Sequence, residues 1–231
     1  EEATSLGVAF CIREAMKRLR MKTSDSTVAI QGFGSVGWNL ARILHEKGYR
    51  VIAVSDSKGG IYSAKGFDPA KVFEYKNKTG SVVGYADTKQ VTNEELLELC
   101  CDVLVPAALE SQITKENANN IKAKIVAEAA NGPITPEADN VLNEKDAFII
   151  PDILDNSGGV TSSYFEWVQN LTRERWSERE ANRKLEGMMV KAFNDVYGIL
   201  KEQEIDMRTA ALILGVGRVA DAIKTLGLWP S

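Results

Sequence analysis

One short stretch decides the fold: Val28-Ala29-Ile30-Gln31-Gly32-Phe33-Gly34-Ser35-Val36-Gly37. An apolar strand enters a G-x-G-x-x-G turn, a helical pattern leaves it, and Asp56 closes the next apolar run about 20 residues after the last glycine, as in the dinucleotide-binding fingerprint. Gly32 permits the tight turn, Gly34 lets the backbone approach a pyrophosphate, and Gly37 lets the helix lie close to the strand. Free N–H groups at the helix N-terminus favour the phosphates. The stretch therefore predicts dinucleotide binding by residues 32–37; the alternative is a glycine-rich turn in an α/β protein that binds no nucleotide.

The composition is that of an ordinary globular protein. The 231 residues are 44% hydrophobic and 26% charged, with a formal net charge of −4, which suits one large α/β domain or one domain with a helical appendage. No basic excess suggests nucleic acid, and no apolar run has the length of a membrane span. Three cysteines make a poor disulfide framework, and no His or Cys cluster has metal-ligand spacing. We expect no metal, buried and inert thiols, no leader sequence and a cytoplasmic location.

Strand and helix patterns alternate along the first two thirds of the chain. The predicted strands are 27–31, 50–55, 102–106, 123–128 and 147–150, with a short candidate at 82–85. The predicted helices are an amphipathic one at 3–20 and others at 35–47, 69–78, 92–99, 115–121 and 136–142, while 57–66 is predicted to be a loop. This alternation is typical of a doubly wound, Rossmann-like, mostly parallel sheet.

The pattern changes after Pro151. Three helices are predicted, at 160–171, 177–203 and 206–226. We expect residues 1–200 to form the Rossmann-like nucleotide-binding domain with its N-terminal helix, and 201–231 to form a C-terminal helical extension. Because the chain opens on Glu1 with no initiator methionine and at once reads as helix, we expect it to be part of a longer polypeptide.

Nine segments together resemble one family. They are EAT (2–4), QGFGSVG (31–37), SDSKGGIY (55–62), PAALE (106–110), EAANGP (128–133), PDIL (151–154), NSGGV (156–160), SYFEWVQN (163–170) and MRTAA (207–211). In this order they resemble the C-terminal NAD(P)-binding domain of hexameric glutamate dehydrogenases, in the family of Glu/Leu/Phe/Val dehydrogenases. The resemblance covers essentially the whole chain.

The resemblance implies an oxidoreductase that deaminates L-glutamate to 2-oxoglutarate and ammonium with NAD or NADP. It also implies an N-terminal domain, absent here, that carries the catalytic lysines and aspartate and most of a homohexamer interface. We therefore expect no catalytic residue in this chain, which would bind dinucleotide without turnover. Two alternatives stay open: the cofactor domain of a leucine- or phenylalanine-type dehydrogenase, and a non-catalytic NAD-sensing module with a protein partner.

The cofactor preference depends on Asp56, Ser57 and Lys58. A carboxylate at position 56 accepts hydrogen bonds from a ribose diol and repels a 2′-phosphate, which favours NAD. Lys58 is able to pair with that phosphate if its side chain turns toward it. The resemblance implies that family members with the Ser-Asp-Ser-Lys sequence use either NAD or NADP. We favour NAD, with a loop-capping Asp56 as the structural alternative.

The resemblance assigns five further residues to the cofactor. Thr4 matches a residue that bonds the nicotinamide carboxamide, with a helix cap as the alternative. Ala107 and Ala108 follow a strand, where small side chains let a cofactor pass, or simply pack a turn. Asn131 and Asn156 match residues on the nicotinamide side, with turn formation as the alternative.

The predicted substrate contacts are Val160 and Ser163, which share one helix face. The resemblance gives the Ser163 hydroxyl the distal carboxylate of glutamate; a solvated helix surface is the alternative. We expect the neighbouring aromatic residues Tyr164, Phe165 and Trp167 to be core. His45, the only histidine, is predicted to lie at the far end of its helix, away from the site.

Overall fold

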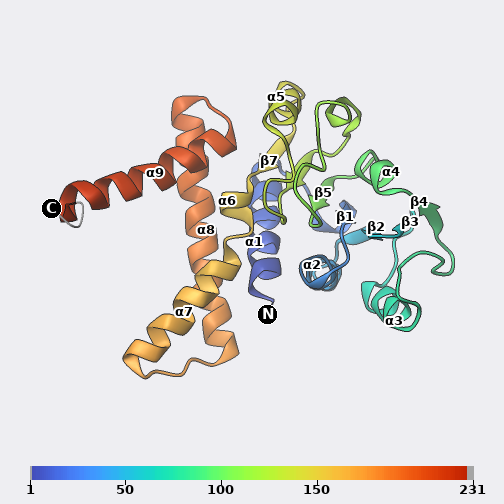
Figure 1. The fold of residues 1–231 in the computed structure, drawn as a ribbon, viewed down its shortest axis with the longest axis horizontal. Helices are drawn as coiled ribbons and strands as arrows, with labels where there is room; N and C mark the ends of the chain where they lie inside the picture. The colour runs from blue at the N-terminus through green and yellow to red at the C-terminus, as the bar shows by residue number, and fades with distance from the viewer. Residues whose placement is uncertain (1, 228–231) are drawn as a thin grey trace.

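A single seven-stranded sheet organises the computed structural model, which describes residues 2–227 (Figure 1). Its strand order is β4-β3-β2-β1-β5-β6-β7. β1, β2, β5, β6 and β7 run parallel, whereas β3 and β4 pair antiparallel at one edge. The strands are β1 (Thr27–Gln31), β2 (Arg50–Asp56), β3 (Gly59–Tyr62), β4 (Lys89–Val91), β5 (Val103–Pro106), β6 (Ile125–Ala127) and β7 (Phe148–Ile150). The doubly wound, mostly parallel sheet predicted from the sequence is confirmed.

Helices cover both faces of this sheet. α1 (Ala3–Arg18), α2 (Ser35–Glu46) and α3 (Pro69–Thr79) share one apolar core, and α4 (Asn93–Leu97) and α5 (Pro136–Glu144) share the other. Successive residues of β5 separate in this way, because Val103 and Val105 join the first core and Leu104 joins the second. This period of two, buried on both faces, explains why the central strands are continuously apolar.

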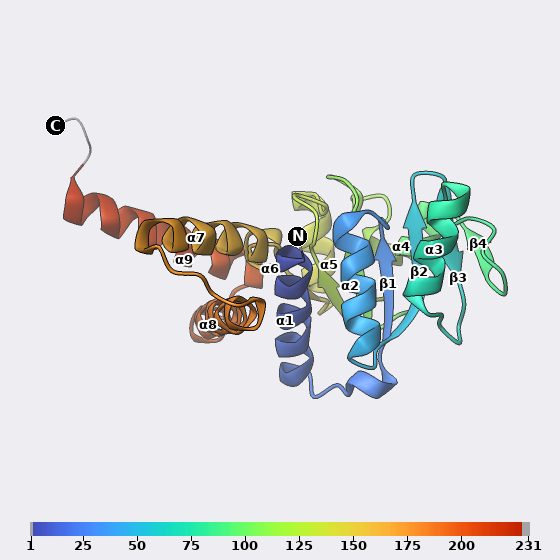
Figure 2. The ribbon, with the colours of Figure 1, turned by 90° about the horizontal axis from the view of Figure 1, so that it is seen from below.

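The C-terminal helices stack beside the sheet rather than on it. α6 (Asp152–Asp155) leads into α7 (Gly158–Thr172), α8 (Glu178–Gln203) and α9 (Met207–Leu226), and Figure 2 shows α1 standing between them and α2. α1 packs on α2 on one side and on α7 and α8 on the other. The prediction that α1 is amphipathic is therefore wrong, because most of its middle is buried all round.

Three local predictions are corrected. Residues 59–62, predicted as loop, form β3, because Gly59 and Gly60 allow an antiparallel turn back along β2. The candidate strand at 82–85 is turn and bend, and the edge strand is β4 instead. The helix predicted at 115–121 is only a short 3-10 turn, Ala118–Asn120.

Two further observations concern exposure. Cys11 and Cys101 are buried as predicted, but Cys100 is exposed, so the expectation of three buried thiols is wrong. Among residues 2–227, no helix has the length and apolar character needed to cross a membrane. Residues 228–231, the end of the expected C-terminal extension, lie outside the described residues.

Candidate functional site

The turn between β1 and α2 gives Gly32 and Gly37 the tight packing that the sequence predicts for them. Gly32 has φ +93°, and a Cβ there would lie 2.8 Å from the Ala107 carbonyl oxygen and 3.0 Å from the Ala108 Cα. A Cβ on Gly37 would overlap the Gly32 carbonyl oxygen. The turn thus packs tightly on the end of β5, and it places Ala107 and Ala108 against the glycine-rich backbone.

Gly34 differs from its two neighbours in the motif. Its backbone is extended, with φ −82° and ψ −161°, a conformation open to any residue. No described atom beyond its chain neighbours lies within 4 Å of the position that a Cβ would take. Gly34 is also the N-cap of α2, without a side-chain cap for the first N–H groups of the helix. The turn therefore offers open space and free backbone donors, and this combination fits a pyrophosphate.

Lys76 of α3 belongs to this turn, although the sequence analysis did not single it out. Its ammonium donates a hydrogen bond of 2.6 Å to the Phe33 carbonyl oxygen. In a trans peptide the carbonyl and the next N–H point in opposite directions, so this bond directs the Gly34 N–H away from Lys76. No sequence motif links a lysine to a glycine turn 43 residues away, and only the packing of α3 on α2 reveals the pair.

Asp56 at the end of β2 is already engaged within the chain. Its Oδ1 accepts hydrogen bonds from the Lys58 N–H (2.9 Å) and the Ser81 hydroxyl (3.1 Å), and its Oδ2 accepts one from the Val82 N–H (2.7 Å). A carboxylate has about four lone-pair sites, so one is left for a ribose hydroxyl. The loop-capping alternative is present in the structure, and Asp56 also keeps one site for an external donor. Ser57 lies exposed in the same turn.

Lys58 directs its side chain toward the end of α3. Its ammonium lies 3.7 Å from the position that a Cβ on Gly80 would take. Lys58 and Asp56 are thus neighbours at one end of the site, at the point where β2 ends.

The residues predicted to lie at the nicotinamide end also come together. The Asn156 side-chain amide donates a 2.7 Å hydrogen bond to the Asn131 side-chain oxygen. A Cβ on Gly159 would lie 2.6 Å from the Thr4 hydroxyl, so Thr4 approaches the segment that follows Asn156. Glu2, and not Thr4, is the N-cap of α1, so the helix-cap alternative for Thr4 is wrong. These side chains come from three separate segments: the loop after β6, the C-cap of α6 and the first turn of α1.

α7 presents Val160 and Ser163 to the outside. Val160 is 69% exposed, and the Ser163 hydroxyl donates a 3.3 Å hydrogen bond to the Gly159 carbonyl oxygen. Phe165 is buried as predicted, but Tyr164 and Trp167 are exposed, so the prediction that all three aromatic residues are core is wrong. The exposed apolar side chains follow one helical stripe, which sequence periodicity alone cannot distinguish from a buried one.

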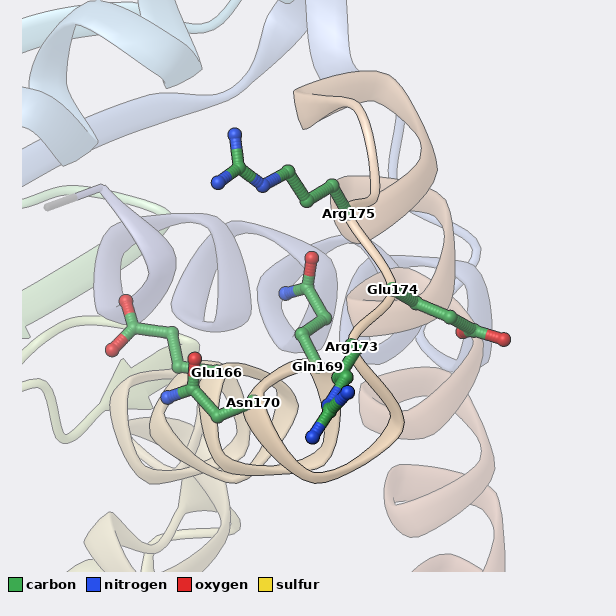
Figure 3. A pocket seen from close by; sticks show the side chains of 6 residues that line it. All are labelled: Glu166, Gln169, Asn170, Arg173, Glu174 and Arg175. Carbon is green, nitrogen blue, oxygen red and sulfur yellow. The ribbon is translucent and has the colours of Figure 1, made fainter.

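A polar pocket lies at the C-terminal end of α7 and the segment that connects it to α8 (Figure 3). None of the predicted site residues lines it; the lining residues are Glu166, Gln169, Asn170, Arg173, Glu174 and Arg175. No group of three His, Cys, Asp or Glu residues within 2–227 is arranged to hold a metal ion. His45 lies in the last turn of α2, opposite the end that carries Gly34.

These features define a doubly wound α/β domain with an open glycine turn at the carboxyl end of the central parallel strand, which is the geometry of the dinucleotide-binding fingerprint. The chain belongs to the Glutamate/Leucine/Phenylalanine/Valine dehydrogenase family, whose model matches residues 1–227. It is 51% identical over all of its 231 residues to a glutamate dehydrogenase of Thermotoga maritima, and covers 56% of that protein. It is 48% identical to the cryptic catabolic NAD-specific glutamate dehydrogenase GudB of Bacillus subtilis, with 98% of this chain and 53% of that protein covered. The chain thus spans about half the length of the curated relatives it matches.

Solved structures are similar over the same extent. A leucine-bound hetero-hexameric glutamate dehydrogenase from Thermus thermophilus superposes with a TM-score of 0.93 at 33% identity, covering 99% of this chain and 54% of that one. An L-tryptophan dehydrogenase from Nostoc punctiforme superposes with a TM-score of 0.72 at 29% identity, covering 96% of this chain and 60% of that one. The fold is therefore shared by dehydrogenases named for different amino acids.

Proposed function

We propose that this chain is the cofactor-binding half of an NAD-dependent glutamate dehydrogenase. The observation that carries the proposal is the open turn at Gly34, held between the tightly packed Gly32 and Gly37, in a chain that matches the family from residue 1 to 227. A bound dinucleotide supplies a nicotinamide ring that accepts hydride from the substrate amino acid, or returns it in reductive amination.

The chain's own residues bind and orient that cofactor. The backbone of Gly32, Phe33, Gly34, Ser35, Val36 and Gly37 holds the pyrophosphate, and Asp56, Ser57 and Lys58 hold the adenosine ribose. Ala107 and Ala108 line the path between the two ends, and Thr4, Asn131 and Asn156 orient the nicotinamide side. Polar groups from separate elements converge at the carboxyl ends of parallel strands, where doubly wound sheets bind ligands.

NAD is the favoured cofactor over NADP. The negative charge of Asp56 is held in place by three intramolecular hydrogen bonds, so a 2′-phosphate beside it would meet a fixed like charge. Several relatives are named NAD-specific glutamate dehydrogenases, including GudB and RocG of B. subtilis and that of Staphylococcus aureus.

The proposed substrate and assembly are supported by relatives of whose length this chain covers about half. Val160 and Ser163 contribute to the glutamate pocket, which the other half of the parent polypeptide completes with its proton-transferring residues. Residues 1–200 form the nucleotide domain, and residues 201–231 return toward that other half. The exposed apolar side chains of α9, with Val216 at 65% and Val219 at 60% exposure, are consistent with such a partner. We infer a cytoplasmic homohexamer for the parent.

A leucine- or phenylalanine-type dehydrogenase is the second candidate, favoured by the apolar and exposed Val160 on the substrate face. A non-catalytic NAD sensor is the third, because the chain by itself carries no proposed catalytic residue. Turnover of glutamate against leucine and phenylalanine by the parent polypeptide separates the first two, and absence of turnover of all three amino acids supports the third.

Fluorescence titration of the 231-residue chain with NADH and NADPH tests the proposed cofactor function. We expect saturable NADH binding that is tighter than NADPH binding, and no glutamate-dependent reduction of NAD. If the chain binds neither nucleotide, the proposal is refuted. If this chain alone turns over glutamate, the proposal that the other half of the parent polypeptide supplies the proton-transferring residues is refuted.

A further inference from the structure

Arg208, in the first turn of α9, reaches from the C-terminal helices into the edge of the nucleotide site. Its guanidinium donates a pair of hydrogen bonds to Glu128, from Nη2 to Oε1 (2.8 Å) and from Nη1 to Oε2 (3.0 Å). Two further bonds, of 3.0 and 2.9 Å, go to Asp139 Oδ1. A guanidinium that holds two carboxylates in this way is fixed in position and in orientation.

Glu128 is the residue that makes this contact more than a surface ion pair. It directly follows β6 and is fully buried. Burial raises the pKa of Glu128, whereas the hydrogen bonds from Arg208 lower it. A buried carboxylate without its cation is costly, so Glu128 and Arg208 keep each other in place.

Hydrogen bonds connect Glu128 to the two segments that carry Asn131 and Asn156. Its Oε2 accepts a 2.7 Å hydrogen bond from the Asp152 N–H at the start of α6. The Asp152 carboxylate in turn accepts a 2.8 Å hydrogen bond from the Gly132 N–H. Gly132 directly follows Asn131, and α6 ends at its C-cap Asn156. The chain of bonds from Arg208 therefore reaches both partners of the Asn131–Asn156 hydrogen bond.

We propose that Arg208 is a positioning residue, which sets the Asn131–Asn156 pair at the nicotinamide end through Glu128 and Asp152. This inference rests on the proposed cofactor function. It means that α9, which carries several exposed apolar side chains, is coupled to the part of the proposed site that holds the nicotinamide ring. If Arg208 has only a structural role, it anchors α9, and its loss affects the binding of the adenosine end and of the nicotinamide end of the cofactor equally.

Two ligands separate these roles. NADH contains both ends of the cofactor, whereas ADP-ribose has the adenosine and pyrophosphate parts and lacks the nicotinamide. Affinities for both are measured by calorimetry on the 231-residue chain and on Arg208→Gln and Asp152→Ala. Asp152→Ala removes the bond from the Gly132 N–H and a longer ion pair of 3.6 Å between Asp152 Oδ1 and Arg208 Nη1, and it leaves both Arg208–Glu128 hydrogen bonds in place. Arg218→Gln is the matched control, because Arg218 lies on the same helix and, among residues 2–227, its ion pair is with Asp195 of α8 (3.0 Å), away from Glu128 and Asp152.

We expect Arg208→Gln and Asp152→Ala to weaken NADH binding about five- to tenfold, the scale of one or two misplaced hydrogen bonds. ADP-ribose binding stays unchanged, and Arg218→Gln leaves both affinities unchanged. An equal loss of affinity for NADH and ADP-ribose, or no loss of affinity for either, overturns the inference. If Arg208→Gln does not fold, Asp152→Ala decides by the same comparison. A wild-type chain that binds neither ligand refutes the proposed function itself, whereas wild-type binding with no NADH-selective loss refutes only the role of Arg208.

Discussion

The substitution Gly34→Ala separates cofactor binding from folding. An added Cβ at Gly34 meets no described atom within 4 Å beyond its neighbours, and the backbone at this position, φ −82° and ψ −161°, suits alanine. Replacing glycine by alanine at a compatible position stabilises a protein by about 0.4–1 kcal/mol, because the unfolded chain loses conformational freedom. We therefore expect Gly34→Ala to unfold at a slightly higher urea concentration than the wild type.

The same methyl group occupies the space proposed for the pyrophosphate. Overpacking by one such group costs about 1–3 kcal/mol, which corresponds to roughly a five- to 150-fold loss of NADH affinity. Gly37→Ala is the contrasting variant, since its Cβ would overlap the Gly32 carbonyl oxygen. There we expect a loss of about 3 kcal/mol or more in the free energy of unfolding, as α2 is pushed from β1.

Urea unfolding followed by circular dichroism gives the stability of each variant, and NADH fluorescence gives its affinity. The predicted pattern is a stable Gly34→Ala that binds poorly beside a destabilised Gly37→Ala. A Gly34→Ala chain that binds NADH as tightly as the wild type would show that the pyrophosphate does not lie over this turn.

The remaining predictions concern Lys76, Asp155 and the cysteines. Lys76→Met should weaken NADH and ADP-ribose alike by about tenfold in titrations, because the Phe33 carbonyl loses a charge-assisted hydrogen bond; unequal losses would contradict this. Burial, reinforced by Glu128 and opposed only in part by the neighbouring Cys11 thiol, raises the pKa of the fully buried Asp155. The folded chain thus keeps a proton that the unfolded chain releases, so stability falls as pH rises above about 4, the ordinary carboxyl value. Asp155→Ala should raise the free energy of unfolding at pH 8 by about 1–3 kcal/mol and flatten this slope in urea titrations; an unchanged slope would contradict it. A thiol reagent should modify the exposed Cys100 fast, while burial protects Cys11 and raises the pKa of Cys101 to about 12; three equal rates would contradict the burial.

The parallel core of the sheet was predictable from the sequence because its strands are buried on both faces. β1, β5 and β6 read as continuous apolar runs, and each falls within its predicted range. The antiparallel edge was not predictable, because β3 begins with Gly59 and Gly60 and has no apolar run. Its conformation depends on pairing with β2 and not on local propensity.

The candidate site also contains residues that were predictable from the sequence and residues that were not. Residues within one motif, such as Gly32 and Gly37, were predictable because neighbours in sequence form the turn. Lys76 and Arg208 act over long separations in the chain, through hydrogen bonds to Phe33 and Glu128. A charged side chain on an amphipathic helix gives no sequence signal that separates a solvated group from one that reaches into a site.

A crystal structure of the 231-residue chain with NADH would show where the pyrophosphate binds. We expect electron density for the pyrophosphate beside the N–H groups of Gly34 and Ser35, with the nicotinamide beside Asn131 and Asn156. Nucleotide density elsewhere, for example in the polar pocket between α7 and α8, with the Gly34 turn empty at saturating NADH, would contradict it.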